Sequence, residues 1–511
     1  MDDVHIVWHR RDLRVHDNKA LFEATKDHTK SILPVFIIDP FFFSEDRLDS
    51  DDRILFMFEC LEDLKQSYRN LGIHMHIYFG DSVEIISKLQ KKYRAKVHYN
   101  FDSSMLYGYS RDNKVKLNKN FIGYQNDALV RDGPSRIAWA KQAQDYFDDN
   151  IYTLNKTKTY KGIVQEKQIR LGKVAQKYNL KKKQTYPLRG GESIALTHLD
   201  EFISKHISLY SRSISKPELS KLNCSRLSAH YSLGALSPKY AYQRVMASKH
   251  SKRTKDFYVT RLFWREHFTQ KLEDYPHAQQ KAINPICNVE REKNQKYTDA
   301  FFKAQTGFPI IDAALRCLID TGWLNFRSRA MLASFYSLIL RQHWKDGADF
   351  MHRHLVDGDI AINYQQWQMQ SALVGVHPLR IYNPRKMIEE HDSQGIFIKK
   401  HLEVFRNVKE VEYLCEPQKY AYQLKSQYGI ILGEDYPKPI VNFEKEAKET
   451  RALVKEKLDE IRASLNDPNF LKKASFSKLR KFRKNERKEK AKRKLEEKNK
   501  DTSQKSLGDF L

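Results

Sequence analysis

Short runs of apolar and β-branched residues alternate with helix-length segments in the first quarter of the chain. This alternation restricts the possible folds more than any other feature. We expect strands at residues 4–8, 31–38, 74–79 and 96–100, with helices between them at 53–70 and 82–93. Strands and helices that alternate at this spacing predict a parallel sheet with crossover connections, so residues 1–130 are expected to form a doubly wound α/β domain. No G-x-G-x-x-G sequence follows the first expected strand, so a dinucleotide fingerprint is absent.

The composition changes twice after this region. Residues 131–195 are basic and polar, which is typical of a connector that lies over the surface. From residue 196 to 440, apolar positions recur at helical period and predict a larger all-helical domain. The clearest examples are Phe257, Thr260, Arg261, Trp264 and Phe268, followed by Leu332, Phe335, Tyr336 and Ile339. Residues 441–511 are rich in Lys, Glu and Arg, which predicts an appended charged helix and a disordered tail.

The charge of the chain points to an anionic partner. Its 90 Lys and Arg against 64 Asp and Glu give a formal net charge of +26, which repels itself in a compact fold. Fifteen Lys or Arg but only four Glu lie between residues 471 and 500. We expect this segment to bind DNA through its phosphates without reading sequence. The alternative is a solvated tail of no specificity.

No apolar run is long enough to cross a bilayer, and no secretory signal is visible. We therefore expect a soluble, intracellular monomer without membrane contact, in the cytoplasm, nucleoid or nucleus. The five cysteines lie far apart and include no Cys-x-x-Cys pair, so we expect neither disulfides nor a metal site.

One polar segment interrupts the helical half where its neighbours look buried. Residues 357–367 combine two carboxylates, Asp357 and Asp359, with the carboxamide of Asn363 and the indole of Trp367. Ionised side chains are rarely interior unless a partner offsets the cost of removing them from water. The segment therefore indicates a polar partner such as a bound ligand. The alternative is a helix N-cap followed by ordinary core.

Six further motifs accompany this segment. They are residues 8–14 (WHRRDLR), 225–230 (SRLSAH), 264–266 (WRE), 306–314 (TGFPIIDAA), 321–329 (TGWLNFRSR) and 391–395 (HDSQG). In this order and spacing, the chain strongly resembles the photolyase and cryptochrome family. The resemblance implies a light-dependent DNA repair photolyase, which uses reduced FAD to split UV-induced pyrimidine dimers by photoinduced electron transfer. The alternative is a cryptochrome-type blue-light photoreceptor that binds FAD without repair.

The resemblance also implies which residues hold FAD. These are Tyr210, Cys224, Ser225, Arg226, Leu227, Ser228, Tyr258, Arg265, Arg329, Asp357, Gly358, Asp359 and Asn363. Residues 225–228 stand at an expected helix start, where hydroxyl and N–H groups suit a diphosphate. Arg329 is expected to pair with Asp357 and keep it ionised. Asn363 matches the position that faces flavin N5, where Asn is the photolyase choice.

Trp367 and Trp344 match the first two members of the family's electron-transfer chain. Such rings must be closely spaced, because electron tunnelling falls steeply with distance. The third member aligns with Arg291, which cannot carry an electron. Either Tyr297 or another aromatic replaces it, or photoreduction is inefficient. We therefore assign Trp344, Trp367 and Asn363 to the chemistry.

The expected lesion pocket departs from the family. Relatives that repair cyclobutane dimers carry Glu, Asn, Met and Trp at positions that align with Arg261, Phe326, Ala330 and Met369, and the histidines of (6-4) relatives align with Phe326 and Ala330. Trp264 keeps one stacking wall for a flipped base. We expect UV-damaged duplex DNA to contact Arg261, Trp264, Phe326, Arg327 and Met369. The lesion type stays open, and so does a pocket that takes no lesion.

We expect two further ligands, the first from the family resemblance and the second from a separate motif at the carboxyl end. A second antenna chromophore, which relatives bind in the amino-terminal domain, is a folate, a deazaflavin or a flavin, and the sequence does not choose among them. The carboxyl-terminal residues Gln504, Leu507, Phe510 and Leu511 resemble a peptide that binds a sliding clamp. One helical turn would place the three apolar side chains in a common pocket while Gln504 forms a hydrogen bond nearby.

Overall fold

The structure, a computed structural model, describes residues 4–44, 47–102, 106–131, 139–155, 159–164, 169–182, 188–377 and 379–475, and a few positions between 481 and 489. The expected clamp-binding residues Gln504, Leu507, Phe510 and Leu511 lie outside the described residues, as does most of the basic segment 471–500. Over the part of the chain that is described, every helix is too short or too polar to cross a bilayer.

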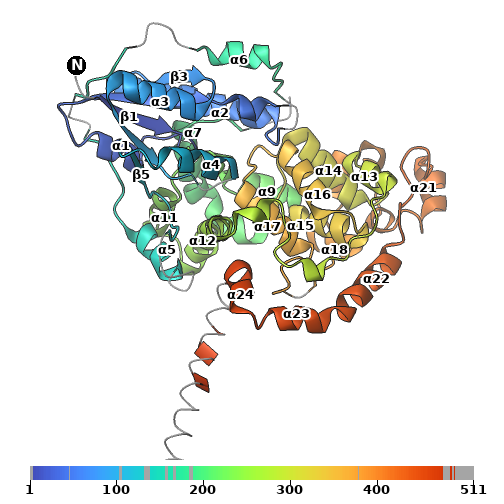
Figure 1. Cartoon of the computed structure of the whole chain (residues 1–511). Helices are drawn as coiled ribbons and strands as arrows, with labels where there is room; N and C mark the ends of the chain where they lie inside the picture. Colours follow the sequence, from blue (N-terminus) through green and yellow to red (C-terminus); the bar gives the residue numbers. More distant parts are fainter. Residues whose placement is uncertain are drawn as a thin grey trace, which may run out of the picture.

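Five parallel strands form the amino-terminal sheet, in the order β3-β2-β1-β4-β5 (Figure 1). They are β1 (Val4–His9), β2 (Ser31–Ile38), β3 (His76–Phe79), β4 (Lys96–Asn100) and β5 (Phe121–Tyr124). The four expected strands and the doubly wound order are confirmed, although β3 begins two residues later than expected. β5 was not anticipated. Only its first residue is fully buried and it contains Gly123, so its β signal in the sequence is weak.

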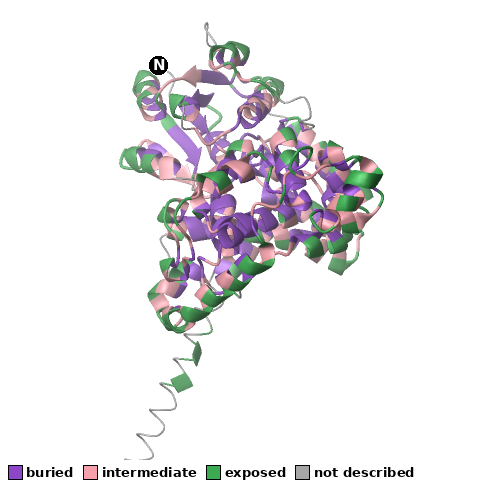
Figure 2. Ribbon diagram, turned by 90° about the vertical axis from the view of Figure 1, so that its right-hand side faces the viewer, coloured by how far each residue is buried: buried purple, intermediate pink, exposed green. Residues whose placement is uncertain are grey.

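Helices cover both faces of the sheet. Val7 of β1 packs in one core with α2 (Asp51–Asn70), whereas its neighbours Ile6 and Trp8 pack in a second core with α3 (Ser82–Tyr93). Because both faces are covered, the central strands β1 and β2 are buried almost throughout and read as continuous apolar runs (Figure 2). The remaining helices of this domain are α1 (Lys19–Ala24) and α4 (Leu106–Val115).

The rest of the described chain is helical apart from loops, as expected. The connector region contains α5 (Trp139–Asp148) and α6 (Leu171–Lys177). The helical domain contains α7 (Glu192–Glu201), α8 (Ile207–Ser213), α9 (Pro217–Asn223), α10 (Ser228–Ser232), α11 (Pro238–Met246), α12 (Lys252–Asp274), α13 (Gln295–Phe302), α14 (Pro309–Thr321), α15 (Phe326–Ser334), α16 (Trp344–His354), α17 (Ile360–Gln370), α18 (Pro384–His391), α19 (Ile396–His401), α20 (Val411–Cys415) and α21 (Ala421–Tyr428).

The helical period predicted helices in both segments correctly, and only one of the two stripes is buried throughout. Leu332, Phe335, Tyr336 and Ile339 are all fully buried in the largest core, and the last three form a π-helical turn. The stripe on α12 is mixed, because Trp264 is 43% exposed whereas Phe268 is buried. Both side chains line a cavity that this side of α12 borders.

Three helices form the appended segment: α22 (Phe443–Glu456), α23 (Leu458–Ser464) and α24 (Pro468–Ala474). They pass beneath the helical domain and end near α12 (Figure 1). Thr450 Oγ1 donates to the Leu338 carbonyl at 2.6 Å, and Asn284 Nδ2 donates to Ser464 Oγ at 3.1 Å. The prediction of a single appended helix was therefore wrong, since three helices pack against the body.

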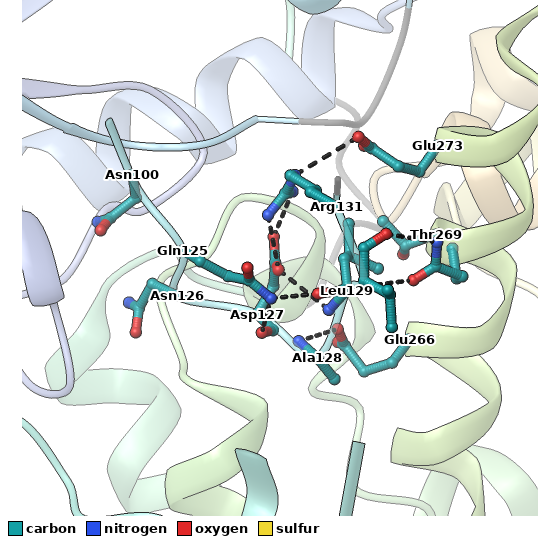
Figure 3. A network of polar contacts seen from close by, with 12 residues as sticks. Asn100, Gln125, Asn126, Asp127, Ala128, Leu129, Arg131, Glu266, Thr269 and Glu273 are labelled. Atoms are coloured by element: carbon teal, nitrogen blue, oxygen red, sulfur yellow. Dashed lines mark hydrogen bonds and ion pairs between the residues drawn. The ribbon is translucent and has the colours of Figure 1, made fainter. Parts of the chain in front are cut away.

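Residues 125–131 leave the sheet and dock on α12 through polar contacts (Figure 3). Arg131 pairs with Asp127 at 2.7 Å and lies 3.5 Å from Glu273 of α12. The Ala128 N–H donates to Glu266 of α12 at 3.3 Å, and burial raises the pKa of this glutamate. These contacts fix α12 relative to the sheet, so they also fix the cavity that α12 borders.

The two domains are joined by a buried arginine. Arg53 of α2 donates from Nη1 to Ser232 Oγ at 2.8 Å and to the Val356 carbonyl at 2.9 Å. Its Nε donates to Asp49 at 2.8 Å. Although burial opposes ionisation of Asp49, Arg53 and His352 hold the pKa of this carboxyl well below its ordinary value.

Arg53→Ala is expected to lower the free energy of unfolding by about 3 kcal/mol, because it leaves Asp49 without its main partner and the Val356 carbonyl without a donor. Urea denaturation followed by tryptophan fluorescence measures this loss. Lys88→Ala, which removes an exposed pair with Glu84 on α3, is the matched control and should leave stability almost unchanged. Equal stability of the two variants would contradict the bridging role of Arg53.

Candidate functional site

A cavity of about 340 Å³ opens into the helical domain between α12, α15, α17 and residues 224–232. This volume is typical of small-molecule sites. All the residues expected to hold FAD line it except Gly358. They are Tyr210, Cys224, Ser225, Arg226, Leu227, Ser228, Tyr258, Arg265, Arg329, Asp357, Asp359 and Asn363. The fold therefore gathers in one place residues that are up to 153 positions apart.

Both buried carboxylates are paired with arginines. Arg329 Nη2 donates to Asp357 Oδ1 at 3.0 Å and to Oδ2 at 2.8 Å, which confirms the predicted pair. Asp359 accepts a hydrogen bond at 2.9 Å from Arg11 of the amino-terminal domain, which the sequence analysis missed. Burial opposes ionisation of Asp359, but Arg11 and Arg265 hold the pKa of this carboxyl below its ordinary value. The cavity wall is thus neutralised by the chain itself.

Helix α17 presents an amide and an indole to the cavity. Asp359 is its N-cap and accepts from the Ile362 N–H at 3.2 Å, so the N-cap alternative is also correct. Asn363 and Trp367 follow four residues apart, on one face. Asn363 Nδ2 donates to the Ala348 carbonyl at 2.9 Å, which fixes the carboxamide. Among the described residues no group donates to Asn363 Oδ1, which is left as an acceptor.

Comparison with known proteins identifies the family. Residues 5–120 match the model of DNA photolyase, and residues 258–456 match the model of the FAD binding domain of DNA photolyase. The deoxyribodipyrimidine photo-lyase of Synechococcus sp. is 26% identical over 91% of this chain and 98% of its own. The chain belongs to the photolyase/cryptochrome family.

Solved structures of the family share the fold. A cryptochrome of Synechocystis sp. superposes with a TM-score of 0.78 at 21% identity, over 88% of this chain and 99% of its own. An archaeal photolyase from Sulfolobus tokodaii, solved with two FAD molecules, superposes with a TM-score of 0.74 at 25% identity, over 88% of this chain and 99% of its own. The similar proteins include both photolyases and a cryptochrome. Similarity of sequence and fold therefore does not decide between DNA repair and photoreception.

The donor set of the cavity fits the family's FAD. Arg226 adopts a left-handed backbone (φ 55°), and its guanidinium stacks on Trp323 at 4.3 Å from the ring centroid. A non-glycine residue in this region is uncommon and marks a constrained position. Ser225 and Ser228 add hydroxyls beside it. The helix start expected here is present, but α10 has only five residues, so its dipole adds little.

The mouth of the cavity carries exposed aromatic rings. Trp264 and Phe326 are 43% and 45% exposed, and the Arg261 guanidinium lies 5.9 Å from the Phe326 ring. Five residues were expected to contact DNA, and these three of them lie together at the mouth of the cavity. Arg327 lines a separate groove, and Met369 packs against the core. The helical period of α12 could not indicate exposure, because nothing local distinguishes a stripe that faces a cavity from one that faces a core.

Both tryptophans expected to transfer electrons are buried, and one of them lines the cavity. Trp367 lines the cavity, whereas Trp344 is buried behind it with its ring 6.2 Å from that of Tyr364. The ring of Tyr336 lies 6.2 Å from that of Trp367, so Tyr336 is a neighbour that the sequence analysis did not single out. Tyr297, the candidate replacement, stacks under Arg291 at 5.6 Å.

A second cavity of about 280 Å³ lies at the carboxyl ends of the strands, between the two domains. Gly358, expected to bind FAD, lines this cavity instead. Phe41 and Tyr107 stack here with their centroids 4.4 Å apart. Asp39 accepts hydrogen bonds from Ser82 N and Oγ at 3.0 and 2.7 Å. Among the described residues, no cluster of His, Cys, Asp and Glu is arranged to hold a metal ion.

Gly347→Ala is expected to displace the Trp367 indole, because the new Cβ would overlap that ring and lie 2.9 Å from Tyr336 Cδ1. Both rings are buried, so we expect a loss of about 2 kcal/mol in stability and a shift in tryptophan emission. Gly172→Ala is the control, since its Cβ meets nothing within 4 Å. An unchanged melt and spectrum for Gly347→Ala would contradict the tight fit around Trp367.

Proposed function

We propose that this chain is a light-dependent DNA repair photolyase with FAD in the 340 Å³ cavity. The observation that carries the proposal is the mouth of that cavity, where Trp264 and Phe326 are exposed beside Arg261. Exposed rings that adjoin one another at the mouth of a cavity favour a binding site, and a flipped base offers a stacking partner. Reduced FAD, when bound and excited by blue light, supplies the electron that splits a pyrimidine dimer and then takes it back.

The cavity residues divide into groups with different tasks. Arg226 and the hydroxyls of Ser225 and Ser228 would hold the diphosphate, since guanidinium and hydroxyl donors suit phosphate oxygens. Asn363 would accept a hydrogen bond from a flavin N–H through its open Oδ1, and the Ala348 carbonyl keeps this amide oriented. The Arg329–Asp357 pair provides further donors and acceptors at the polar edge.

The mouth would bind the lesion by stacking and charge. Trp264 provides one wall, as the family resemblance implies, and Phe326 a second. Arg261 lies over the rings of Phe257 and Phe326, at 5.1 and 5.9 Å, and this position leaves its charge available to a phosphate. Base stacking on an aromatic side chain contributes about 1–3 kcal/mol.

The rival is a cryptochrome-type photoreceptor that binds FAD without repairing DNA. One observation favours it: Met369 packs against the core, and Phe326 and Ala330 occupy positions that repairing relatives fill with polar residues or Met. This rival retains the FAD residues and loses only the lesion chemistry. Absorption of the purified protein would therefore not distinguish the two functions, whereas a repair assay would.

The test is blue illumination of the reduced protein with oligonucleotides that carry either a cyclobutane dimer or a (6-4) photoproduct. We expect loss of one lesion class, counted by chromatography. Trp264→Ala should bind that lesion about tenfold more weakly, while Tyr422→Ala, which removes a 79% exposed ring elsewhere, serves as control. If the amounts of both lesions stay unchanged while FAD is bound, the repair function is rejected and the photoreceptor function is supported.

We also propose that the second cavity holds an antenna chromophore. Its position at the carboxyl ends of parallel strands supports this, because ligands of such sheets bind where the strand order reverses, here between β1 and β4. The stacked Phe41 and Tyr107 would cover an aromatic ligand. A folate, a deazaflavin and a second flavin all fit this chemistry.

Denaturing the purified protein and separating the released chromophores tests this second site. We expect FAD together with a second absorbing compound, and Phe41→Ala should lose the second compound while retaining FAD. Release of a single FAD per chain, from protein expressed with each candidate compound supplied, would contradict the proposal.

We propose a separate role for each region of the chain. Residues 1–130 would carry the antenna, 131–195 would connect, 196–440 would carry FAD, and 441–511 would add DNA affinity and a clamp-binding end. The domains meet through Arg53 and Arg11, which supports a single working unit within the chain.

A further inference from the structure

One buried tyrosine behind the large cavity is bonded to a carboxylate that solvent reaches. Tyr364 lies on α17 between Asn363 and Trp367, is fully buried and does not line the cavity. Its hydroxyl donates to Asp349 Oδ1 at 2.5 Å, a length typical of a hydrogen bond to an ionised oxygen. Asp349 lies on α16, is partly exposed and pairs with Lys345 at 2.5 Å. The phenol proton of Tyr364 therefore has a charged acceptor that borders on water.

The ring of Tyr364 also contacts one of the two tryptophans expected to carry electrons. Trp344 and Tyr364 meet edge to face, with their ring centroids 6.2 Å apart. Aromatic rings that pack against each other have centroids roughly 4.5–7 Å apart. Because electron tunnelling falls steeply with distance, this contact makes Tyr364 a suitable carrier after Trp344.

The hydrogen bonds of these rings determine where the loss of an electron is stabilised. The Trp367 indole N–H is buried and has no acceptor among the described residues. A Trp367 ring that has lost an electron therefore keeps its proton and remains a strong oxidant. A phenol that has lost an electron is a strong acid, so a base within hydrogen-bond reach favours its oxidation. Burial and Asp349 raise the pKa of Tyr364 above its ordinary value, so the phenol is protonated before it is oxidised.

Two other tyrosines are weaker candidates because they lack such a base. Tyr336 lies 6.2 Å from the Trp367 ring, but within the described chain its hydroxyl contacts only another hydroxyl, that of Thr298 at 3.4 Å. Tyr297, which the sequence suggested, stacks on neither tryptophan, and no described carboxylate accepts from its hydroxyl. Tyr364 alone among these three combines contact with a tryptophan and a base for its proton.

We propose that Tyr364 is the terminal electron donor of the photoreduction chain, in the role of the missing third tryptophan. The inference rests on one part of the proposed function, the binding of FAD, and not on DNA repair. Trp367 would give one electron to light-excited, oxidised FAD and take one from Trp344, which takes one from Tyr364. The O–H bond of Tyr364 then breaks, its proton passes to Asp349, and the ring remains as a neutral tyrosyl radical.

Loss of the proton would make the separation of charge long-lived. Return of the electron to Tyr364 requires Asp349 to give the proton back, and the cation of Lys345 favours release of that proton to water. The cycle closes when a thiol in solution supplies one electron and water returns one proton, which restores the phenol. The chain would thus keep FAD reduced although Arg291 occupies the position of the third tryptophan.

The test is light-induced radical formation in the purified protein, with oxidised FAD bound and without DNA, followed by transient absorption and electron paramagnetic resonance. We expect a neutral tyrosyl radical, which forms more slowly in D₂O because a proton moves with the electron. Tyr364→Phe keeps the ring and removes the hydroxyl, so only a short-lived tryptophan radical should form. Asp349→Asn removes the base and should slow formation of the tyrosyl radical about a hundredfold.

Tyr336→Phe is the matched control, since it removes a hydroxyl from an equally buried ring beside Trp367 and should keep the tyrosyl signal. Bound FAD and the thermal melt show whether each variant is folded. A tyrosyl signal that persists in Tyr364→Phe, or that is lost equally in Tyr336→Phe, would overturn the proposal. A wild-type protein that forms only a tryptophan radical would overturn it as well.

Because no DNA takes part, this proposal and the repair function can fail separately. A protein that repairs dimers after chemical reduction of its FAD, but forms no tyrosyl radical, keeps the enzyme and loses the terminal donor. A protein that forms the radical and repairs neither lesion keeps the donor and loses the enzyme. A purified protein without flavin would overturn both.

Discussion

The arrangement of the site depends on one buried carboxylate. Asp359 accepts from Arg11, 348 residues earlier in the chain, is stabilised by Arg265 of α12, and caps α17 through the Ile362 N–H. Removing an ionised carboxylate from water costs several kcal/mol, so the fold keeps these partners together. The first loop of the sheet, α12 and α17 are thereby held in one geometry. Asn363, one turn along α17 from Asp359, takes its position from this contact.

The arginine partners of Asp357 and Asp359 change how the polar segment 357–367 is interpreted as evidence for a ligand. Two buried aspartates suggested that something bound must offset their desolvation, yet Arg329, Arg11 and Arg265 already do so. The ligand is therefore not needed as a counter-ion. The evidence for a bound ligand is instead the cavity itself, together with Asn363 Oδ1, which accepts no hydrogen bond from any described residue. A wall that is neutral before binding is also preorganised, since its arginines need not move when a cofactor enters.

Local patterns predicted what is local in the structure. Four strands and the buried stripe of Leu332 to Ile339 follow from residue periodicity, and Arg329–Asp357 follows from the family's motifs. Arg11–Asp359 could not be found this way, because their proximity depends on how the two domains pack. β5 was missed because a strand at the sheet edge needs few buried residues. Helical spacing on α12 does not separate the exposed Trp264 from the buried Phe268, and only the tertiary fold shows which of the two faces an opening.

One departure from the family's expected pattern, Arg291, contacts the appended helix α22. Arg291 stands where the resemblance aligns the third electron carrier, and its guanidinium forms an ion pair with Glu446 of α22. Arg341 lies 3.5 Å from the same carboxylate. These ion pairs hold the first half of α22 against the rest of the protein. In the second half of that helix, Arg451 and Lys455 line the groove that Arg327 also lines. A tryptophan at position 291 could not anchor Glu446 by charge. The cation at position 291 therefore helps to hold α22 against the body of the protein.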